Sequence, residues 1–113
     1  MLNHLVIEGV ICKAPRRNTS PAGIPHCQFV LEHYSQQIEA ELNRRAYARI
    51  QVVASGDVLN QDTQDLCQGC MVRVTGFLNR HESNNGQAML VLHARRIEKF
   101  NQENSNGSLL PTS

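Results

Sequence analysis

The amino-acid sequence predicts an all-β domain, a barrel of five strands with one short helical segment. Five segments alternate between apolar and polar residues, or run apolar, over the length of a strand. The run Asn84-Asn85-Gly86 is a strong hairpin signal between the last two of them. The chain has 113 residues, of which 41% are hydrophobic and 19% charged, so it suits one modest core and is not a disordered chain.

The first predicted strand covers residues 4–13, and its apolar residues fall on both faces. One face carries Leu5, Ile7 and Ile11, and the other carries Val6, Val10 and Cys12. This pattern is expected for a strand that is covered on both sides. Residues 14–23 contain two prolines, a glycine and two arginines, which predict a loop.

The second and third strands are predicted over residues 24–35 and 47–55. The inward positions are Cys27, Phe29, Leu31 and His33 on the second strand, and Ala48, Ile50, Val52 and Ala54 on the third. Tyr34 then points outward from one strand, and Tyr47 and Arg49 from the other. Residues 36–46 stay ambiguous, because Ile38 and Leu42 have helical spacing while the polar residues around them suit a long mobile hairpin loop.

A short helix is predicted over residues 57–68, ended by Gly69. Asp57 is the expected cap, and Val58, Leu59 and Leu66 are expected to cover one end of the barrel. Strands follow at 71–79 and 89–98. This order is that of the five-stranded Greek-key OB fold, although other small barrels share such spacing. The sequence therefore predicts an OB-fold domain over residues 1–98 and a polar C-terminal tail over residues 99–113.

The chain has 11 basic and 10 acidic residues, a net charge of +1, so a single protomer would attract a polyanion poorly at long range. Nucleic-acid binding would then need local patches or oligomerisation, and the small core favours a homo-oligomer. The sequence has no apolar stretch of about 18 residues that would predict a membrane span. The N-terminal residues do not read as a signal peptide, so we expect a cytoplasmic protein with reduced cysteines.

The cysteines, acids and histidines do not predict an enzymatic site. Cys67 and Cys70 form a C-x-x-C, but no second close pair completes a zinc site, and the expected position at a helix end is the wrong one for a reactive thiol. The histidines and acids assemble no nucleophile with a base and an orienting group. We therefore expect a protein that is not an enzyme and needs no metal or cofactor.

Binding to single-stranded nucleic acid is the remaining chemistry that the side chains suggest. Bases stack on aromatic rings while guanidinium groups hold phosphates, so rings and arginines on one face form a binding surface without sequence preference. The candidate residues are Arg16, Arg17, Tyr34, Arg44, Arg45, Tyr47 and Arg49. The same pattern also fits a solvated polar face on which two tyrosines cap the sheet.

A resemblance to a known family covers about residues 1–98. The run SPAGIPHCQFVLEH at residues 20–33 closely resembles the PriB family of primosomal replication proteins, within the OB-fold superfamily of single-stranded-DNA-binding proteins. Shorter matches are the spaced pattern in residues 3–15, Val53-x-Ser55-Gly56, Val74-x-Gly76-Phe77 and Val91-Leu92-His93-Ala94. The resemblance implies a homodimer that binds single-stranded DNA and the PriA helicase, with DnaT as a further partner in some bacteria, and that supports replication restart at stalled forks.

The sequence departs from the better-known members of this family at the expected DNA-binding surface. They have Trp where this chain has Tyr47, Arg where it has Tyr34, and lysines in the hairpin where it has Glu82 and Asn84. Because fewer loop cations mean fewer released counterions, we expect weak or modest DNA affinity with a shallow salt dependence. A protein adaptor for PriA that hardly touches DNA, and a thiol or zinc enzyme that uses Cys67 and Cys70, are the alternatives.

Overall fold

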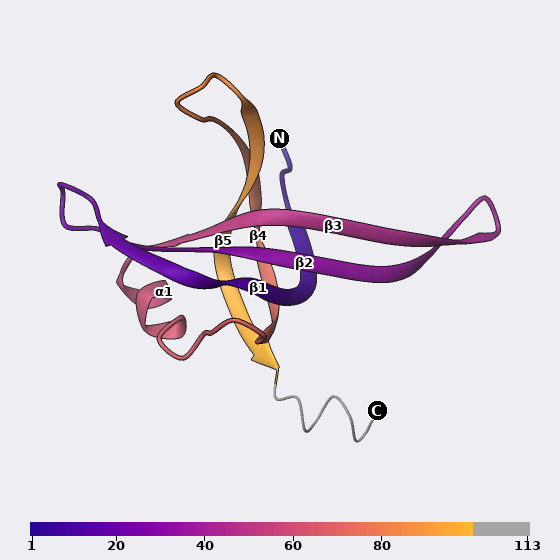
Figure 1. Cartoon of the computed structure of the whole chain (residues 1–113), viewed down its shortest axis with the longest axis horizontal. Helices are drawn as coiled ribbons and strands as arrows, with labels where there is room; N and C mark the ends of the chain where they lie inside the picture. The colour runs from indigo at the N-terminus through magenta and orange to yellow at the C-terminus, as the bar shows by residue number, and fades with distance from the viewer. Residues whose placement is uncertain (101–113) are drawn as a thin grey trace.

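The computed structural model describes residues 1–100, which form five strands and one short helix (Figure 1). The elements are β1 (Leu5–Thr19), β2 (Pro25–Glu39), β3 (Leu42–Ser55), α1 (Asp57–Asp62), β4 (Met71–Glu82) and β5 (Ala88–Phe100). The strands close a barrel in the order β1-β2-β3-β5-β4, in which only the β3–β5 pair is parallel. The predicted OB fold is therefore confirmed. Residues 101–113 of the expected polar tail lie outside the described residues.

The core lies inside the barrel and comes from alternate residues of all five strands, as the sequence pattern predicted. The largest fully buried apolar side chains are Ile11, Leu31, Val52, Val72, Val74 and Leu92. Two glycines let strands approach closely at the barrel wall. One of them, Gly76, lies so near the backbone of β5 that a Cβ atom would be 2.8 Å from the carbonyl carbon of His93.

β1 is longer than predicted, because it continues through residues that the sequence assigned to a loop. The ladder with β2 shifts register between Ile11 and Lys13 and again between Lys13 and Arg16. Pro15 lies within the second shift, where its missing N–H interrupts no regular pair. The true loop is a tight turn in which the Gly23 N–H donates to the Ser20 carbonyl at 2.8 Å.

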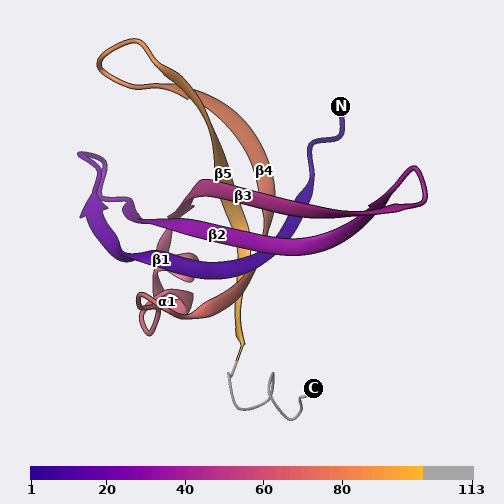
Figure 2. The same ribbon diagram turned by 45° about the vertical axis from the view of Figure 1, so that its right-hand side comes forward.

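The ambiguous residues 36–46 form neither a helix nor a long loop. They extend β2 and β3 into a hairpin whose register runs unbroken from His26 opposite Ser55 to Glu39 opposite Leu42. Its two-residue turn holds Ala40 and Glu41 at φ 53° and 63°, the left-handed conformation of a type I′ hairpin turn. Figures 1 and 2 show this hairpin as an arm that projects beyond the barrel, away from the hairpin of β4 and β5.

The helix α1 is shorter than predicted and is capped differently. Gly56, at φ 102°, is its N-cap residue, and no side chain makes a cap hydrogen bond, so the expected role of Asp57 is wrong. The helix ends at Asp62, and the guanidinium of Arg17 donates to the carbonyl of Thr63, the C-cap residue. Leu59 and Leu66 are buried at the barrel end as expected, but Val58 is 74% exposed.

Candidate nucleic-acid interface

One face of the β2–β3 sheet points away from the barrel interior and continues along the arm; we call it the outer wall. Its cross-strand pairs follow from the register, since residues two apart on a strand share a face. From the barrel to the tip the pairs are Gln28/Val53, Val30/Gln51, Glu32/Arg49, Tyr34/Tyr47, Gln36/Arg45 and Ile38/Asn43. The outer wall therefore carries two rings, two arginines and several amides in one row.

The two tyrosines lie side by side on the outer wall, as the strand pattern predicted. Tyr34 and Tyr47 are directly opposite each other, with ring centroids 4.8 Å apart and planes tilted by 44°. They are 72% and 54% exposed, so each ring keeps surface free for a base. The Tyr47 hydroxyl donates to Glu32 at 3.1 Å, and this hydrogen bond is the main reason that the pKa of Tyr47 is raised, so the phenol is neutral at physiological pH.

The arginines of the hairpin divide between its two faces. Arg45 and Arg49 lie on the outer wall on either side of Tyr47, and Arg49 is 3.9 Å from the carboxylate of Glu32. Arg44 lies on the opposite face, opposite Gln37, and pairs with Glu39 at 3.4 Å. The grouping of Arg44 with the rings is therefore wrong, because successive residues of a strand point to opposite sides.

The two arginines near the end of β1 are also separated. Arg16 lies opposite Gln28 and borders the outer wall. Arg17 lies opposite the buried Cys27 and donates to Thr63 Oγ1 at 3.1 Å and to Asn60 Oδ1 at 3.2 Å. Its guanidinium thus fastens α1 to the barrel, and the structure does not bring Arg17 to the rings.

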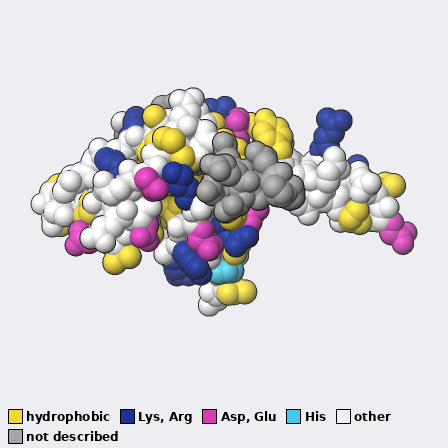
Figure 3. Space-filling view, turned by 90° about the horizontal axis from the view of Figure 1, so that it is seen from below, with side chains coloured by type: hydrophobic (Ala, Val, Ile, Leu, Met, Phe, Trp, Pro, Cys, Tyr) yellow, Lys and Arg dark blue, Asp and Glu magenta, His cyan; other side chains and the backbone are white. Residues whose placement is uncertain are grey.

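Residues that the sequence interpretation did not select complete the surface. Lys13, Gln28 and Gln51 line a hollow next to Arg16. The sequence places both glutamines at outward positions of their predicted strands. An isolated amide matches no binding motif, however, so the sequence did not indicate either of them as a binding residue. Figure 3 shows basic and acidic side chains interspersed on the face that it presents, which agrees with the net charge of +1.

A pair of histidines lies at the far end of the same surface, on β4 and β5. The Nε2 atoms of His81 and His93 are 2.8 Å apart, so one ring donates a hydrogen bond to the other, and Phe77 lies parallel to His93 with centroids 5.0 Å apart. Both histidines line a second hollow with Gln28 and Gln51. The pKa of His93 is lowered, mainly by burial and then by the neighbouring His81.

Lowering the pH is expected to destabilise the fold through His93. Because its pKa is below the ordinary value of 6.5 in the folded state, the unfolded chain binds the proton more tightly. This contribution to stability is fully present at pH values above the pKa of His93 in the unfolded chain. It is lost as the pH falls towards the lower pKa of His93 in the folded protein. Urea unfolding between about pH 7.5 and about pH 5.5 should show the loss. His93→Gln should reduce it, and His4→Gln, at an exposed position, should leave it unchanged.

The two cysteines of the C-x-x-C are in contact through their sulfur atoms. The Sγ atoms of Cys67 and Cys70 are 3.0 Å apart in the turn that follows α1, not at the helix end that the sequence predicted. The hydrogen bond between the two thiols is the main cause that raises the pKa of Cys67, which lowers its thiolate fraction. Within residues 1–100, no three histidines, cysteines or acids are placed to hold a metal ion. The one helix in this range is too short to cross a bilayer.

Comparison with known proteins places this chain in a family. A family model described as another single-strand binding protein family matches residues 3–96. Replication restart protein PriB of Photorhabdus laumondii is 53% identical over 96 residues, which cover 85% of this chain and 91% of that protein.

Solved structures agree with the fold at much lower sequence identity. The PriB structure from Ralstonia solanacearum superposes with a TM-score of 0.74 at 22% identity, covering 89% of this chain and 100% of that one. A Plasmodium falciparum SSB in complex with single-stranded DNA superposes with a TM-score of 0.72 at 14% identity, covering 89% and 96%. Since the sequence match extends over most of the chain and the barrel is shared, the chain belongs to the PriB family of replication restart proteins.

Proposed function

We propose that this chain is a non-enzymatic replication-restart protein that binds single-stranded DNA along its outer wall. The observation that carries the proposal is the exposed pair of Tyr34 and Tyr47 with Arg45 and Arg49 beside it. Rings take the faces of successive bases and guanidinium groups take phosphates, a combination that binds strands of any sequence. An unpaired strand suits this surface because the bases must be free to stack.

The family supports this role. The relative from Photorhabdus laumondii is named as a replication restart protein, and the family model describes single-strand binding proteins. The barrel that this chain shares with the Plasmodium falciparum protein carries single-stranded DNA in that complex. OB barrels commonly bind oligonucleotides on an exposed sheet face, which is where the tyrosines of this chain lie.

We expect the DNA affinity to be weak or modest. The tip of the β4–β5 hairpin, residues 83–87, contains no charged side chain, and Arg80 before it pairs with Glu82 at 3.1 Å. Arg49 is also close to a carboxylate, that of Glu32. A cation that already faces an acid releases fewer counterions when it meets a phosphate, so the salt dependence should be shallow.

The proposed assembly is a homodimer that works with the PriA helicase, and with DnaT where that protein is present. Val6 and Val10 on β1 are 51% and 37% exposed, and such apolar residues on one strand suit contact with a second copy. Dimerisation would also double the number of rings and cations available to one strand, which compensates for the low net charge of a protomer.

The test is titration of a fluorescein-labelled oligo-dT with the purified protein at two salt concentrations, with and without PriA. The proposal expects saturable binding, in the micromolar range, that weakens moderately as salt rises. Nanomolar binding with a steep salt dependence would refute the expected weak affinity but would agree with the proposed DNA-binding role. Absence of DNA binding under all conditions would refute the role itself.

A protein adaptor for PriA is the second candidate. The uncharged hairpin tip and the Arg80–Glu82 ion pair favour it, because they remove free cations from a surface that a strand would otherwise follow. Capture of PriA by an immobilised sample that gives no mobility shift with oligo-dT would support the adaptor against the DNA-binding protein.

A further inference from the structure

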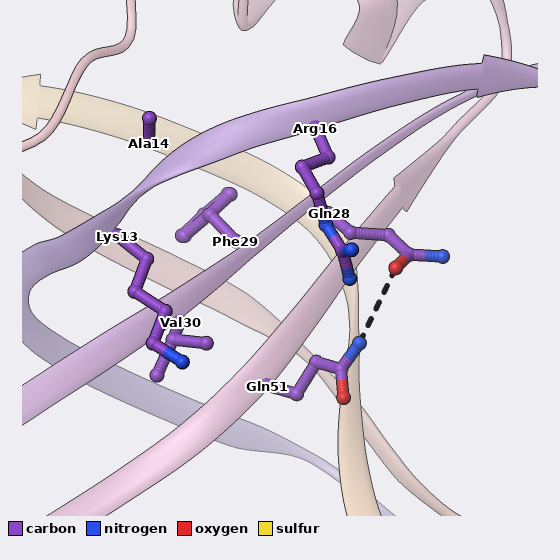
Figure 4. Close-up of a pocket in the computed structure, with 7 residues that line it drawn as sticks. All are labelled: Lys13, Ala14, Arg16, Gln28, Phe29, Val30 and Gln51. Carbon is purple, nitrogen blue, oxygen red and sulfur yellow. Dashed lines mark hydrogen bonds between the residues drawn. The ribbon is translucent and has the colours of Figure 1, made fainter. Parts of the chain in front are cut away.

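A hollow on the barrel side of the outer wall combines two cations with two amides. The hollow is lined by Lys13 and Arg16 of β1, Gln28 of β2 and Gln51 of β3. Figure 4 shows Arg16 beside Gln28, and Lys13 farther along β1 beside Val30. Its volume is about 360 Å³, within the range of sites that hold a small ligand. Phe29 and Val30 also line it, so an apolar surface lies beside the polar groups.

The two cations of this hollow are free of acidic partners. Within the described residues 1–100, the cations that lie within 4.0 Å of a carboxylate are Arg44, Arg49, Arg73, Arg80, Arg96 and Lys99. Lys13 and Arg16 are outside this group, and both are exposed. A cation without a carboxylate neighbour keeps its full attraction for a phosphate, so this hollow offers a phosphate-binding point next to the outer wall.

The two amides leave one hydrogen-bond donor group and one acceptor free for a nucleobase. Gln51 Nε2 donates to Gln28 Oε1 at 3.3 Å, as the dashed line in Figure 4 shows. This bond leaves the Gln28 amide N–H groups free at one end of the pair and the Gln51 carbonyl free at the other, so each amide keeps a group that can meet a base. Every nucleobase carries a neighbouring donor and acceptor along its pairing edge, and an unpaired strand leaves that edge accessible.

The geometry points to a nucleotide subsite. We propose that this hollow, the Gln28–Gln51 subsite, holds one nucleotide of the bound strand: Lys13 and Arg16 bind its phosphate, and Gln28 and Gln51 bind its base edge. The inference rests on the proposed DNA-binding function. The subsite would discriminate between bases, whereas the rings of the outer wall stack on any base. The subsite also supplies the free cations that the β4–β5 hairpin tip lacks.

The cations are tested by the salt dependence of oligo-dT binding. The double variant Lys13→Gln, Arg16→Gln should lower the slope of log affinity against log salt by about 0.7 for each lost cation. The matched control removes two cations that already face acids, Arg73→Gln with Arg80→Gln, and should change the slope less. Equal slopes for the test variant and the wild type would overturn the phosphate part of the subsite.

The amides are tested by base preference. Gln51→Met keeps the length of the side chain but removes its acceptor, so the affinity ratio between oligo-dC and oligo-dT should change by about three- to tenfold. The salt slope should stay that of the wild type. A ratio that does not change would overturn the base-edge part, and circular dichroism of each variant verifies that the barrel is intact.

These results separate the subsite from the function on which it rests. If the wild type binds oligo-dT and Tyr47→Ala weakens it, but neither the cation nor the amide variants differ from the wild type, the function holds and the subsite is wrong. If the wild type itself binds no oligonucleotide, the proposed function fails and the subsite fails with it.

Discussion

Tyr47→Ala is expected to weaken the binding of oligo-dT by about 1–3 kcal/mol, the usual contribution of one base stacked on an aromatic ring. Tyr47 is 54% exposed at the centre of the outer wall, between Arg45 and Arg49, so its ring is the natural position for a base whose phosphates meet both arginines. The measurement is fluorescence anisotropy with a labelled oligonucleotide at low salt, together with the oligomeric state from light scattering.

Two further variants show whether the ring itself is responsible. Tyr47→Phe removes the hydroxyl that donates to Glu32 but keeps the ring, so its affinity should stay within about threefold of the wild type. Tyr34→Ala should weaken binding as well, and the double variant should deviate from additivity because the two rings are in contact. Unchanged affinity in both alanine variants would place the DNA-binding surface elsewhere on the barrel.

Gly76→Ala is expected to destabilise the barrel by at least about 3 kcal/mol, or to prevent folding. The new Cβ atom would overlap the carbonyl oxygen of His93 and would lie 3.0 Å from the Ala94 Cα, so the obstacle is the backbone of β5, not a movable side chain. On its other edge β4 pairs with β1, with Gly76 opposite Leu5, so β4 has little freedom to retreat from β5. Thermal and urea unfolding of the purified variant measure the effect.

Gly86→Ala is the matched control. Gly86 is in the turn between β4 and β5 at φ 82°, and a Cβ atom there would have no heavy atom within 4 Å. Gly86→Ala should lower the free energy of unfolding only by the cost of a left-handed backbone at a residue with a Cβ atom, about 1–2 kcal/mol. Equal stability losses in the two variants would show that backbone conformation, and not the close approach of β4 to β5, determines the effect at Gly76.

The sequence predicted the outer wall where alternation is regular. Tyr34 and Tyr47 occur in strands whose inward positions are nearly all apolar, so their outward direction follows from a period of two residues. The same rule identified the core, and the strand order then required β2 and β3 to be neighbours. The DNA-binding role of these residues remains a prediction.

The sequence could not predict the face on which each arginine lies, because it did not predict the backbone conformation around the arginines. Residues 14–23 contain prolines and a glycine and predict a loop, while residues 36–46 suit either a helix or a long hairpin loop, so neither segment gives its arginines a defined face. Both segments are largely extensions of strands. Arg16 and Arg17, like Arg44 and Arg45, therefore point to opposite faces, and only one of each pair reaches the outer wall.

The turn at the tip of the arm, between β2 and β3, consists of residues that disfavour the backbone conformation of this turn. Asn-Gly or Asp-Gly would suit a type I′ turn, whereas Ala40 and Glu41 adopt positive φ with a Cβ atom present. The last pairs of the hairpin should consequently open far more often than the barrel unfolds, and their amide hydrogens should exchange first. If DNA binds along the outer wall as proposed, an arm that loosens from its end inwards can adjust its curvature to the bound strand, while Tyr34 and Tyr47, closer to the barrel, keep their spacing.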